Sequence, residues 1–579
     1  MRNKEVAEKF YELAKLAEIA GENPFKVRAY LEAARRIENL TVPIEDLAKE
    51  NKLTEIKGIG KSIAEKIEQY LNTGKIEKLE MLKEKVPPSL IELEKVPGLG
   101  AKRAKILYET LGIKTVDELR KAAESGKIRN LPGFGEKTEK KILEGLKSMR
   151  DKTVDRVLLG IAYPLAQSIV QELKENSPID KIQVCGSIRR MKETIGDIDI
   201  LVTSEKPDKV MDAFVKLPQV KEIIVKGDTK TSILTHENLQ VDLRVVEPSS
   251  FGAAIQYFTG SRQHNIHLRE LAIKKGLKIN EYGVFDLSTN KKIAGEREED
   301  VYEALGLQWI PPEMREDRGE IELAEKHEIP TLIELKDIKG DLHLHTTYSD
   351  GTASIEDMAK EAMKLGYEYI VISDHAKALG IANGLSIERY LEEKKEIESL
   401  NKKYAPFKIF LGTELNILTD GELDFSDEQL DIFDICLAGI HTAFNQSKEQ
   451  MTKRILSAII NPYVRIIVHP TGRILNGRGG FDLDLDKLFS EAKKRGTVFE
   501  INSSPERLDL NDLNAKKAKE EYGLRLSIDT DAHSIDSLHN MFYGVGVARR
   551  AWLTNDDVIN AKSLKEFETF LKERKSRRK

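Results

Sequence analysis

The spacing of apolar residues changes along the chain and divides it into three parts. Residues 1–150 carry apolar side chains three and four positions apart, as in EVAEKFYELAKLAEI and FKVRAYLEAARRIENL, and this spacing predicts amphipathic helices. From about residue 181, apolar strands joined by turns appear, and from about residue 337 short apolar strands alternate with helical stretches. The last pattern is typical of a β/α barrel. The sequence therefore predicts a multi-domain protein in which a helical part precedes α+β and α/β parts.

The polar residues of the last part follow its expected strands. A histidine or an acidic residue stands at the C-terminal end of nearly every strand, and in β/α barrels that end carries the active site. Seven of the eleven histidines lie after residue 336, and six of those seven occupy such strand ends. Six of the expected strands are 367–375, 407–415, 433–441, 464–470, 497–504 and 524–533.

Composition narrows the class of protein. Charged residues make up 33% and hydrophobic residues 40% of the 579 residues, which is ordinary for a soluble protein, and the length predicts about four domains. The two cysteines, Cys185 and Cys436, exclude a disulfide scaffold and fit a reducing compartment. No run approaches the roughly 18 apolar residues of a membrane span, and MRNKEVAEKF lacks the apolar core of a secretory signal. We therefore expect a cytoplasmic protein without membrane association.

The formal net charge of −5 argues against a uniformly basic nucleic-acid binder. Counting by segment weakens that argument, because residues 1–150 hold 31 Lys and Arg against 25 Asp and Glu. Residues 151–320 hold 24 against 28, and residues 321–579 hold 37 against 44. The helical part is thus the basic one, either as a nucleic-acid-binding surface or merely as a solvated one.

Three similar elements recur in the helical part, at 53–67, 93–107 and 128–143. Each has a short helix, a turn of the form Gly-apolar-Gly and a second helix that bears lysines. Two glycines let the backbone turn tightly and approach a ligand, and the helix N-terminus presents free N–H groups that suit a DNA phosphate. The elements resemble the helix-hairpin-helix motif of DNA repair proteins and polymerases. The alternative, strongest for the third copy, is a helical hairpin used only for packing. The glycines expected to contact DNA are Gly58, Gly60, Gly98, Gly100, Gly133 and Gly135.

Three aspartates in the middle part form a candidate metal site. Asp197 and Asp199 stand two positions apart, so both carboxylates face the same side of one strand. Asp242 lies in the apolar strand LQVDLRVV, where a lone acid would need a salt bridge or a strand end to explain it. Three acids from two strands instead fit two Mg²⁺ (or Mn²⁺) ions, which prefer oxygen ligands and serve phosphoryl transfer.

A candidate triphosphate site precedes the aspartate pair. Gly186 and Ser187 are followed closely by Arg189 and Arg190. Backbone N–H groups, a hydroxyl and guanidinium groups all suit a triphosphate. The arrangement G-S-x(9)-D-x-D resembles the nucleotidyltransferase superfamily, which includes enzymes other than polymerases, so the motif leaves the substrate open.

The stretch YFTGSRQHNIHLRELAIKKGLKINEYGVF, at 257–285, closely resembles the thumb region of family X DNA polymerases. With the upstream motifs, the resemblance runs in register from about residue 5 to residue 318. It implies that Asp197 and Asp199 bind both metals and that Asp242 completes the site of the metal that activates the primer 3′-hydroxyl. The chain departs from the vertebrate repair enzymes at 262–264, so its contacts with the base are expected to differ.

The same resemblance assigns roles around the nucleotide. Tyr257 and Phe258 line the sugar, and Asn265 faces the base in the minor groove. Arg269 contacts the template strand, and Arg244 matches an arginine that regulates the site. The implied nucleotide-binding residues are Gly186, Ser187, Arg190, Gly196, Tyr257, Phe258, Gly260 and Asn265.

The first helical unit resembles the small lyase domain of this family. By that resemblance, Lys66 occupies the position of the Schiff-base lysine that removes 5′-deoxyribose phosphate, and Lys26 and Tyr30 match its neighbours. Ser62 stands where the vertebrate pattern has a second lysine. Lys66 is therefore a candidate lyase nucleophile, with an ordinary exposed helix lysine as the alternative.

The strand ends of the last part combine imidazole and carboxylate groups, which suit Zn²⁺ or Mn²⁺ better than Ca²⁺. They resemble the polymerase and histidinol phosphatase (PHP) domain, in which nine ligands hold up to three metals that activate water to attack phosphorus. By that resemblance, one metal is held by His343, His345, Glu414 and Asp531, a second by Glu414, His441 and His469, and a third by Asp350, His375 and His533. The implied catalytic residues of the whole chain are Asp197, Asp199, Asp242, His343 and Glu414. Strand-end loops also carry Arg473, Asn502 and Arg507, which could hold a substrate phosphate or form local salt bridges.

The resemblance implies a bacterial or archaeal family X DNA polymerase that fills gaps in DNA repair. Its PHP domain would be a metal-dependent 3′→5′ exonuclease or phosphoesterase, with abasic-site endonuclease and 3′-phosphatase activity as further options. Two other functions fit the residues: a phosphoesterase whose polymerase half only binds DNA, and a non-catalytic scaffold on gapped DNA. The expected partners are gapped or primer–template DNA and dNTPs, and the expected state is a monomer. The expected domains are a lyase-like helical domain at 1–85, fingers with two helix-hairpin-helix motifs at 86–150, palm and thumb at 151–318, a linker at 319–336 and a PHP barrel at 337–579.

Overall fold

The computed structural model describes residues 2–38, 40, 43–56, 58–94, 96, 99–151 and 156–575, so Gly98 lies outside the described residues. The chain forms two compact units, Met1–Val154 and Asp155–Lys579. Within the described ranges, no helix has the length and apolar character needed to cross a bilayer.

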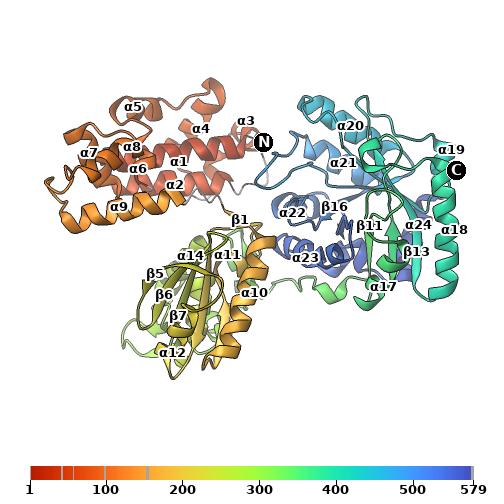
Figure 1. Cartoon of the computed structure of the whole chain (residues 1–579). Coiled ribbons are helices and arrows are strands. Elements are labelled where there is room, and N and C mark those ends of the chain that lie inside the picture. Colours follow the sequence, from red (N-terminus) through yellow and green to blue (C-terminus); the bar gives the residue numbers. More distant parts are fainter. Residues whose placement is uncertain are drawn as a thin grey trace. The chain divides into compact units, whose positions relative to one another are not determined.

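The first unit is helical in its described residues (Figure 1). Its buried side chains form one core. Helix α1 turns one face toward this core, since Phe10, Leu13 and Ala17, which are spaced along one side of the helix, are fully buried. The helices are α1 (Asn3–Ala20), α2 (Pro24–Glu38), α3 (Ile44–Lys49), α4 (Lys61–Thr73), α5 (Glu77–Lys85), α6 (Leu90–Glu94), α7 (Ala101–Leu111), α8 (Val116–Glu124) and α9 (Glu136–Asp151).

A five-stranded sheet begins the second unit, with strand order β2-β4-β7-β6-β5. Strands β4 and β7 are parallel and place Asp199 opposite Asp242, whereas the other neighbours are antiparallel. Helices α10 and α12 pack against this sheet. The elements are β1 (Val157–Leu158), α10 (Leu159–Asn176), β2 (Lys181–Val184), α11 (Gly186–Arg189), β3 (Thr194–Ile195), β4 (Asp197–Thr203), α12 (Pro207–Phe214), β5 (Val220–Lys226), β6 (Lys230–Thr235) and β7 (Gln240–Val245).

A smaller helix-and-strand region follows the sheet. Its elements are α13 (Phe251–Thr259), α14 (Arg262–Lys274), β8 (Leu277–Asn280), β9 (Gly283–Asp286), β10 (Lys292–Ala294), α15 (Glu298–Ala304) and α16 (Glu320–Lys326). Helix α16 lies inside 319–336, the stretch that the sequence predicts as a linker. It is packed rather than free, because Ile321, Ala324 and Leu332 join the buried core of this region.

Seven parallel strands form the barrel in sequence order, from β11 to β17. A bridge between Leu344 and Ala532 brings the end of the last strand to the first, so the barrel is nearly closed. The strands are β11 (Gly340–Leu344), β12 (Tyr369–Ile372), β13 (Lys408–Asn416), β14 (Ile435–Gly439), β15 (Val464–Ile467), β16 (Val498–Asn502) and β17 (Leu526–Asp529).

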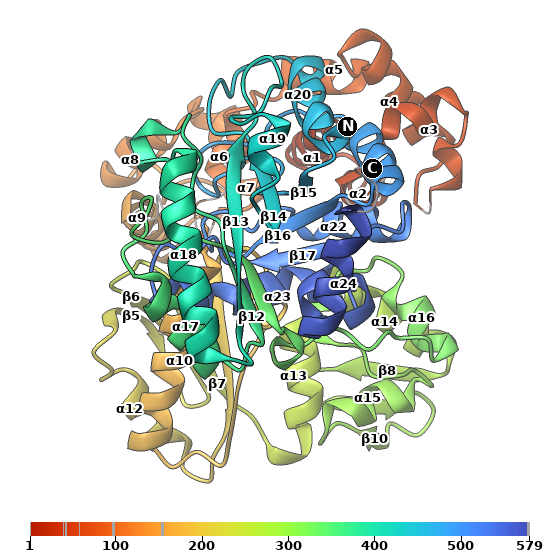
Figure 2. The same ribbon diagram turned by 90° about the vertical axis from the view of Figure 1, so that its right-hand side faces the viewer.

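Helices cover the barrel, and one of them closes the end at which the strands begin. Figure 2 shows α18 along the outside of β13. Phe567 of α24 stacks on Tyr369 at a ring distance of 4.5 Å and fills the end where the strands begin, which leaves the C-terminal ends of the strands free for chemistry. The predicted mixed fold with a distorted β/α barrel is confirmed. The helices are α17 (Ile355–Lys364), α18 (Ile387–Tyr404), α19 (Asp427–Leu430), α20 (Lys448–Ile460), α21 (Leu485–Arg495), α22 (Asp512–Glu520), α23 (Met541–Arg550) and α24 (Leu564–Lys575).

Candidate functional site

The nine candidate metal ligands of the barrel gather at the C-terminal ends of its strands. His343 lies in β11 with His345 just beyond it, and Glu414 lies in β13. Parallel strands end at one rim, so residues far apart in the sequence meet there. The remaining six follow strands β11, β12, β14, β15 and β17: Asp350, His375, His441, His469, Asp531 and His533.

Glu414 is the centre of this cluster and is fully buried. Its Oε1 lies 2.9 Å from Nε2 of His441 and 2.8 Å from Nε2 of His469. Its Oε2 lies 2.8 Å from Nδ1 of His375. Burial alone would raise the pKa of Glu414, but His375 and His441 hold that pKa well below its ordinary value. Glu414 is therefore an anion that three imidazoles surround.

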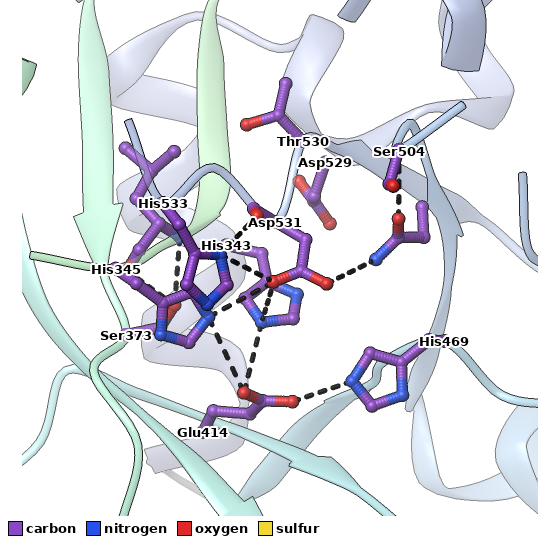
Figure 3. A network of polar contacts seen from close by, with 12 residues as sticks. His343, His345, Ser373, Glu414, His469, Ser504, Asp529, Thr530, Asp531 and His533 are labelled. Atoms are coloured by element: carbon purple, nitrogen blue, oxygen red, sulfur yellow. Dashed lines mark hydrogen bonds and ion pairs between the residues drawn. The ribbon is translucent and has the colours of Figure 1, made fainter. Parts of the chain in front are cut away.

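A second set of atoms has the spacing of shared metal ligands (Figure 3). Nε2 of His343 lies 3.4 Å from Oε2 of Glu414 and 3.6 Å from Oδ1 of Asp531. Nε2 of His345 lies 3.6 and 3.3 Å from the same two oxygens. Tetrahedral ligand bonds of about 2.0–2.2 Å place ligand atoms about 3.4 Å apart. Both Nε2 atoms are buried without a hydrogen-bond partner among the described residues. So is Oε2 of Glu414, because its contact with Nδ1 of His375 lacks hydrogen-bond geometry. The donor set therefore fits a cation.

A third set lies toward the open side of the rim. Ligand atoms of His345, Asp350, His375 and His533 all lie within 4.8 Å of one another. Oδ1 of Asp350 is 3.4 Å from Nε2 of His533, and its Oδ2 is 3.7 Å from Nε2 of His375. The sequence resemblance groups three of these residues without His345. The structure adds His345, which thus lies between two ligand sets.

Residues behind the ligands hold the rings in place, and sequence reasoning missed two of them. Oε1 of Glu500 lies 2.7 Å from Nδ1 of His343, and Oδ1 of Asn416 lies 2.8 Å from Nδ1 of His441. Such partners fix the tautomer and the orientation of a metal-binding imidazole. Asn416 ends β13 and Glu500 is a charged residue in the middle of the apolar strand β16, and these positions are the one signal that could have indicated them. Asn502, a candidate for the substrate phosphate, instead donates to Oδ2 of Asp531 at 3.1 Å.

The three aspartates of the five-stranded sheet converge at one end of β4 and β7. Asp199 faces Asp242 across the parallel pair, and Asp197 begins β4. Burial and the charges of Asp197 and Asp242 raise the pKa of Asp199 to about 7. An added Cβ at Gly186, whose φ is +67°, would lie 2.9 Å from Oδ2 of Asp199, so only glycine lets the backbone come this close to the carboxylate.

Asp242 has cationic and amide partners. Nζ of Lys230 lies 3.0 Å from its Oδ2, and Nε2 of Gln240 donates to its Oδ1 at 2.8 Å. Burial would raise the pKa of Asp242, but these hydrogen bonds lower it below its ordinary value. Three carboxylates at one strand end, two of them with raised pKa values, fit a divalent cation.

The two arginines expected at the triphosphate separate. Arg189 points away, because Nη1 contacts Oε1 of Glu298 at 2.7 Å and Oγ1 of Thr259 at 2.7 Å. Glu298 and Thr259 thus engage the Arg189 guanidinium, and its expected contact with the triphosphate stays a prediction. Arg190 lies near the aspartates. Burial and the charge of Asp242 raise the pKa of Asp197, and the positive charges of Arg156 and Arg190 partly offset that rise.

The residues expected around the sugar and base lie on α13 and α14. The rings of Tyr257 and Phe258 are 5.1 Å apart at a steep angle, and the guanidinium of Arg244 lies 4.6 Å from the centre of the Phe258 ring. Asn265 is held by a hydrogen bond from its Nδ2 to the carbonyl of Tyr257 at 2.7 Å. Arg269 is exposed.

In the first unit, the Gly-apolar-Gly turns precede α4, α7 and α9. The apolar residues Ile59, Leu99 and Phe134 are 2%, 3% and 9% exposed, so they anchor the turns in the core. An added Cβ at Gly60 or Gly100 would meet no described atom within 4 Å, so these backbones face open space.

The third turn differs from the first two. Helices α4 and α7 have no acidic residue in their first turn, whereas α9 begins with Glu136 and contains Glu139. Glu139 is 2% exposed and bonded to Arg129 at 2.7 Å. A negatively charged first turn is unfavourable for a phosphate, which favours a packing role for the turn at Gly133 and Gly135.

Lys66 borders a pocket of about 700 Å³ in the first unit, together with Lys26, Tyr30, Lys78 and Ser62. Nζ of Lys66 donates to Oγ and to the carbonyl of Ser62, each at 3.0 Å. The residues that the lyase resemblance singles out therefore lie around one cavity.

Family models match five segments of the chain. They are a helix-hairpin-helix domain at 1–76, a SAM-like helix-hairpin-helix tandem at 90–148, a DNA polymerase beta palm at 162–268, a DNA polymerase beta thumb at 254–316 and a PHP domain at 341–503.

Curated relatives match the whole chain or its parts. The DNA polymerase/3′-5′ exonuclease PolX of Bacillus subtilis (strain 168) is 40% identical over 574 residues, which is 99% of this chain and 100% of the relative. A probable phosphatase of Thermoanaerobacter sp. (strain X514) is 33% identical over 247 residues, which cover 41% of this chain and 95% of the relative. DNA polymerase lambda of Rattus norvegicus is 26% identical over 345 residues, covering 54% of this chain and 56% of the relative.

Proposed function

This chain belongs to the family X DNA polymerases that carry a C-terminal PHP domain, and we propose that its two metal-binding clusters perform opposed reactions at a DNA 3′ end. It is a DNA polymerase with 3′–5′ exonuclease activity, as the resemblance in its sequence predicts. The observation that carries the proposal is the presence in one chain of two separate clusters of ligand side chains, the palm carboxylates and the barrel rim.

We assign Asp197, Asp199 and Asp242 as the metal ligands of the polymerase. Two Mg²⁺ (or Mn²⁺) ions, when bound, would stabilise the attacking 3′-oxygen and the leaving oxygen of the triphosphate. The parallel pairing of β4 and β7 brings the carboxylates together, and Lys230 and Gln240 hold that of Asp242 in place. Gly186 lets the backbone of the phosphate-binding turn lie against them.

The remaining palm and thumb residues position the nucleotide. Ser187 and Arg190 supply a hydroxyl and a guanidinium for the triphosphate, next to Gly196 and Gly260. Tyr257 and Phe258 line the sugar, and Asn265, fixed by the carbonyl of Tyr257, faces the base. Arg269 is free to contact the template strand, and Arg244, against the Phe258 ring, ties the sugar-binding residues to strand β7.

In the barrel, we assign the nine rim residues as ligands of up to three Zn²⁺ or Mn²⁺ ions. Such ions, when bound, would activate water and neutralise charge on the phosphate. Glu414, His343 and His345 supply the buried part of the site. Arg507 is 26% exposed with Nε 3.7 Å from Oδ2 of Asp531, and it is the residue we assign to the substrate phosphate. Arg473 is engaged elsewhere, with Glu193.

An assay on a one-nucleotide gap tests these roles. With Mg²⁺ and dNTPs, the protein should add the templated nucleotide, and without dNTPs it should shorten the strand from its 3′ end. A phosphoesterase whose polymerase half only binds DNA would give shortening alone, and a scaffold would give neither.

Several finer features are part of the proposal. We propose gapped DNA as the preferred substrate, repair as the role, and a cytoplasmic monomer as the state. We also propose the domains as drawn from the sequence, with 319–336 belonging to the thumb core rather than serving as a linker.

The metal requirement of the polymerase should depend on pH. A pKa of about 7 means that Asp199 loses its charge as pH falls through neutrality, and a proton then competes with the metal. We expect the half-saturating Mg²⁺ concentration for nucleotide addition to rise about tenfold from pH 8 to pH 6. Titrating Mg²⁺ at fixed ionic strength across that range measures it, and an unchanged requirement would contradict the assignment.

Lys66 should form a Schiff base with a 5′-deoxyribose phosphate end if its pocket is a lyase site. Borohydride should then trap the protein on incised abasic DNA, and Lys66→Ala should reduce the trapped fraction at least about tenfold. Lys75→Ala, an exposed lysine outside the pocket, should leave trapping unchanged. Equal trapping by the wild type and Lys66→Ala would assign the lysine to the solvated surface.

A further inference from the structure

The barrel contacts the segment of the palm that carries the phosphate-binding residues. We call residues 186–196 the phosphate segment. Nη1 of Arg550, at the end of α23 in the barrel, donates to the carbonyl of Arg190 at 2.7 Å. The same nitrogen donates to Oε1 of Glu316 at 2.9 Å, and Glu316 in turn accepts from Nε of Arg190 at 3.1 Å. Arg550 thus holds Arg190 both directly and through Glu316.

The far side of Arg550 is also fixed. Its Nη2 donates to Oδ2 of Asp512 at 2.8 Å, and Arg318 donates to the same oxygen at 2.9 Å. The Arg550 side chain is 4% exposed and that of Glu316 is 12% exposed. Burial would raise the pKa of Glu316, but Arg550 and Arg190 hold it well below its ordinary value. Buried charges of this kind are stable only when each keeps its partner.

Two more contacts hold the rest of the phosphate segment. Nη2 of Arg473, on the loop after β15, contacts Oε2 of Glu193 at 2.7 Å, and its Nε donates to the carbonyl of Arg507. Met191 packs against α23 so closely that an added Cβ at Gly546 would lie 2.5 Å from its Cε. The barrel therefore contacts the phosphate segment at Arg190, Met191 and Glu193.

The orientation of Arg190 follows from these contacts. Its Nη1 donates to the carbonyl of Thr259, and its Nε is held by Glu316. Among the described residues, Nη2 has no hydrogen-bond partner, and the side chain lies in the field of Asp197. Two of the three nitrogens thus fix the guanidinium, and the third is free for a phosphate oxygen.

We propose that Arg550 is a positioning residue for nucleotide addition, so that the barrel completes the triphosphate site of the palm. The inference rests on the proposed role of Arg190. A guanidinium that is already oriented loses less conformational freedom when it binds a phosphate, so fixing Arg190 strengthens dNTP binding. Removing Arg550 would release both Glu316 and the carbonyl of Arg190, so the Arg190 guanidinium would lose its fixed orientation.

Steady-state addition of one nucleotide to gapped DNA tests the proposal with the full chain. Arg550→Met should raise the KM for dNTP about tenfold, the cost of weakening a charge-assisted contact, while kcat changes less. The KM of Arg550→Lys should lie between those of the wild type and Arg550→Met. The matched control is Arg549→Met, because Arg549 joins the same helix to Glu313 at 2.8 Å without touching Arg190, and it should leave the KM unchanged.

Two further measurements keep the outcome decisive. Exonuclease rate and melting temperature of each preparation report whether the barrel is folded, and Arg550→Met should keep the wild-type exonuclease rate. If Arg550→Met does not fold, Glu193→Gln, which breaks a half-exposed pair, should still raise the KM about threefold.

The variants separate failure of the inference from failure of the proposed function. The inference alone would be overturned if Arg190→Ala raises the KM for dNTP while folded Arg550→Met keeps the wild-type KM. Arg190→Ala with a wild-type KM would overturn the proposed role of Arg190 and the inference with it. A KM raised equally by Arg549→Met and Arg550→Met would show that both act through domain docking, which also overturns the inference.

Discussion

Replacing Asp242 by asparagine is expected to lower templated nucleotide addition at least about a thousandfold while 3′-end degradation continues at the wild-type rate. Asparagine has the same shape but lacks the charge that, in the proposed site, would hold a metal beside the primer 3′-hydroxyl. Asp242 is the palm carboxylate whose pKa the hydrogen bonds of Gln240 and Lys230 lower, so it is fully ionised at neutral pH. Single-turnover extension of a gapped primer measures the effect.

The matched control is Asp212→Asn. Asp212 lies in the same sheet-and-helix region but is exposed and paired with Lys226, so both activities should stay within about twofold of the wild type. Extension by Asp242→Asn at a tenth or more of the wild-type rate would remove Asp242 from the metal site.

The second large effect is expected at Glu414. Its two oxygens contact three histidines within 2.9 Å, so Glu414→Gln should disturb every metal of the barrel at once. Loss of this carboxylate charge should reduce degradation of a 3′ end at least about a thousandfold and leave nucleotide addition intact. Release of the terminal nucleotide from 5′-labelled single-stranded DNA with Mn²⁺ measures it.

Metal content distinguishes this effect from misfolding. Glu414→Gln should bind fewer Zn²⁺ or Mn²⁺ ions per chain while its polymerase rate shows that the protein is folded. Glu422→Gln, an exposed glutamate on the loop after β13, should keep both metal and activity. A Glu414→Gln protein that degrades DNA at the wild-type rate would contradict the assignment of the barrel rim.

Most of both ligand sets could be predicted from the sequence because their residues are unusual for their positions. An aspartate pair such as Asp197 and Asp199 at the start of an apolar strand, or His343 and His345 in DLHLH, costs free energy in a fold unless the side chains bind something. Strands are also set by local pattern, so six of the seven barrel strands, β12 to β17, lie at the apolar runs that the sequence predicts as strands.

What the sequence could not reveal depends on contacts between distant residues. The spacing of Arg189 and Arg190 suggests two triphosphate ligands, but the partner that engages Arg189, Glu298, is more than a hundred residues later. Glu500 behind His343 and Arg550 behind Arg190 are hidden for the same reason. Periodicity identifies which face of a helix or strand is buried, but not which charged residue of a distant segment contacts it.

One measurement tests most directly the central claim that two independent metal sites act on one 3′ end. Gapped DNA with a 5′-labelled primer is incubated with wild type, Asp242→Ala or His343→Ala, with and without dNTPs. Asp242→Ala should shorten the primer under both conditions and never extend it, and His343→Ala should extend it and never shorten it. A folded variant of either kind that loses both activities, or keeps both, would contradict the claim.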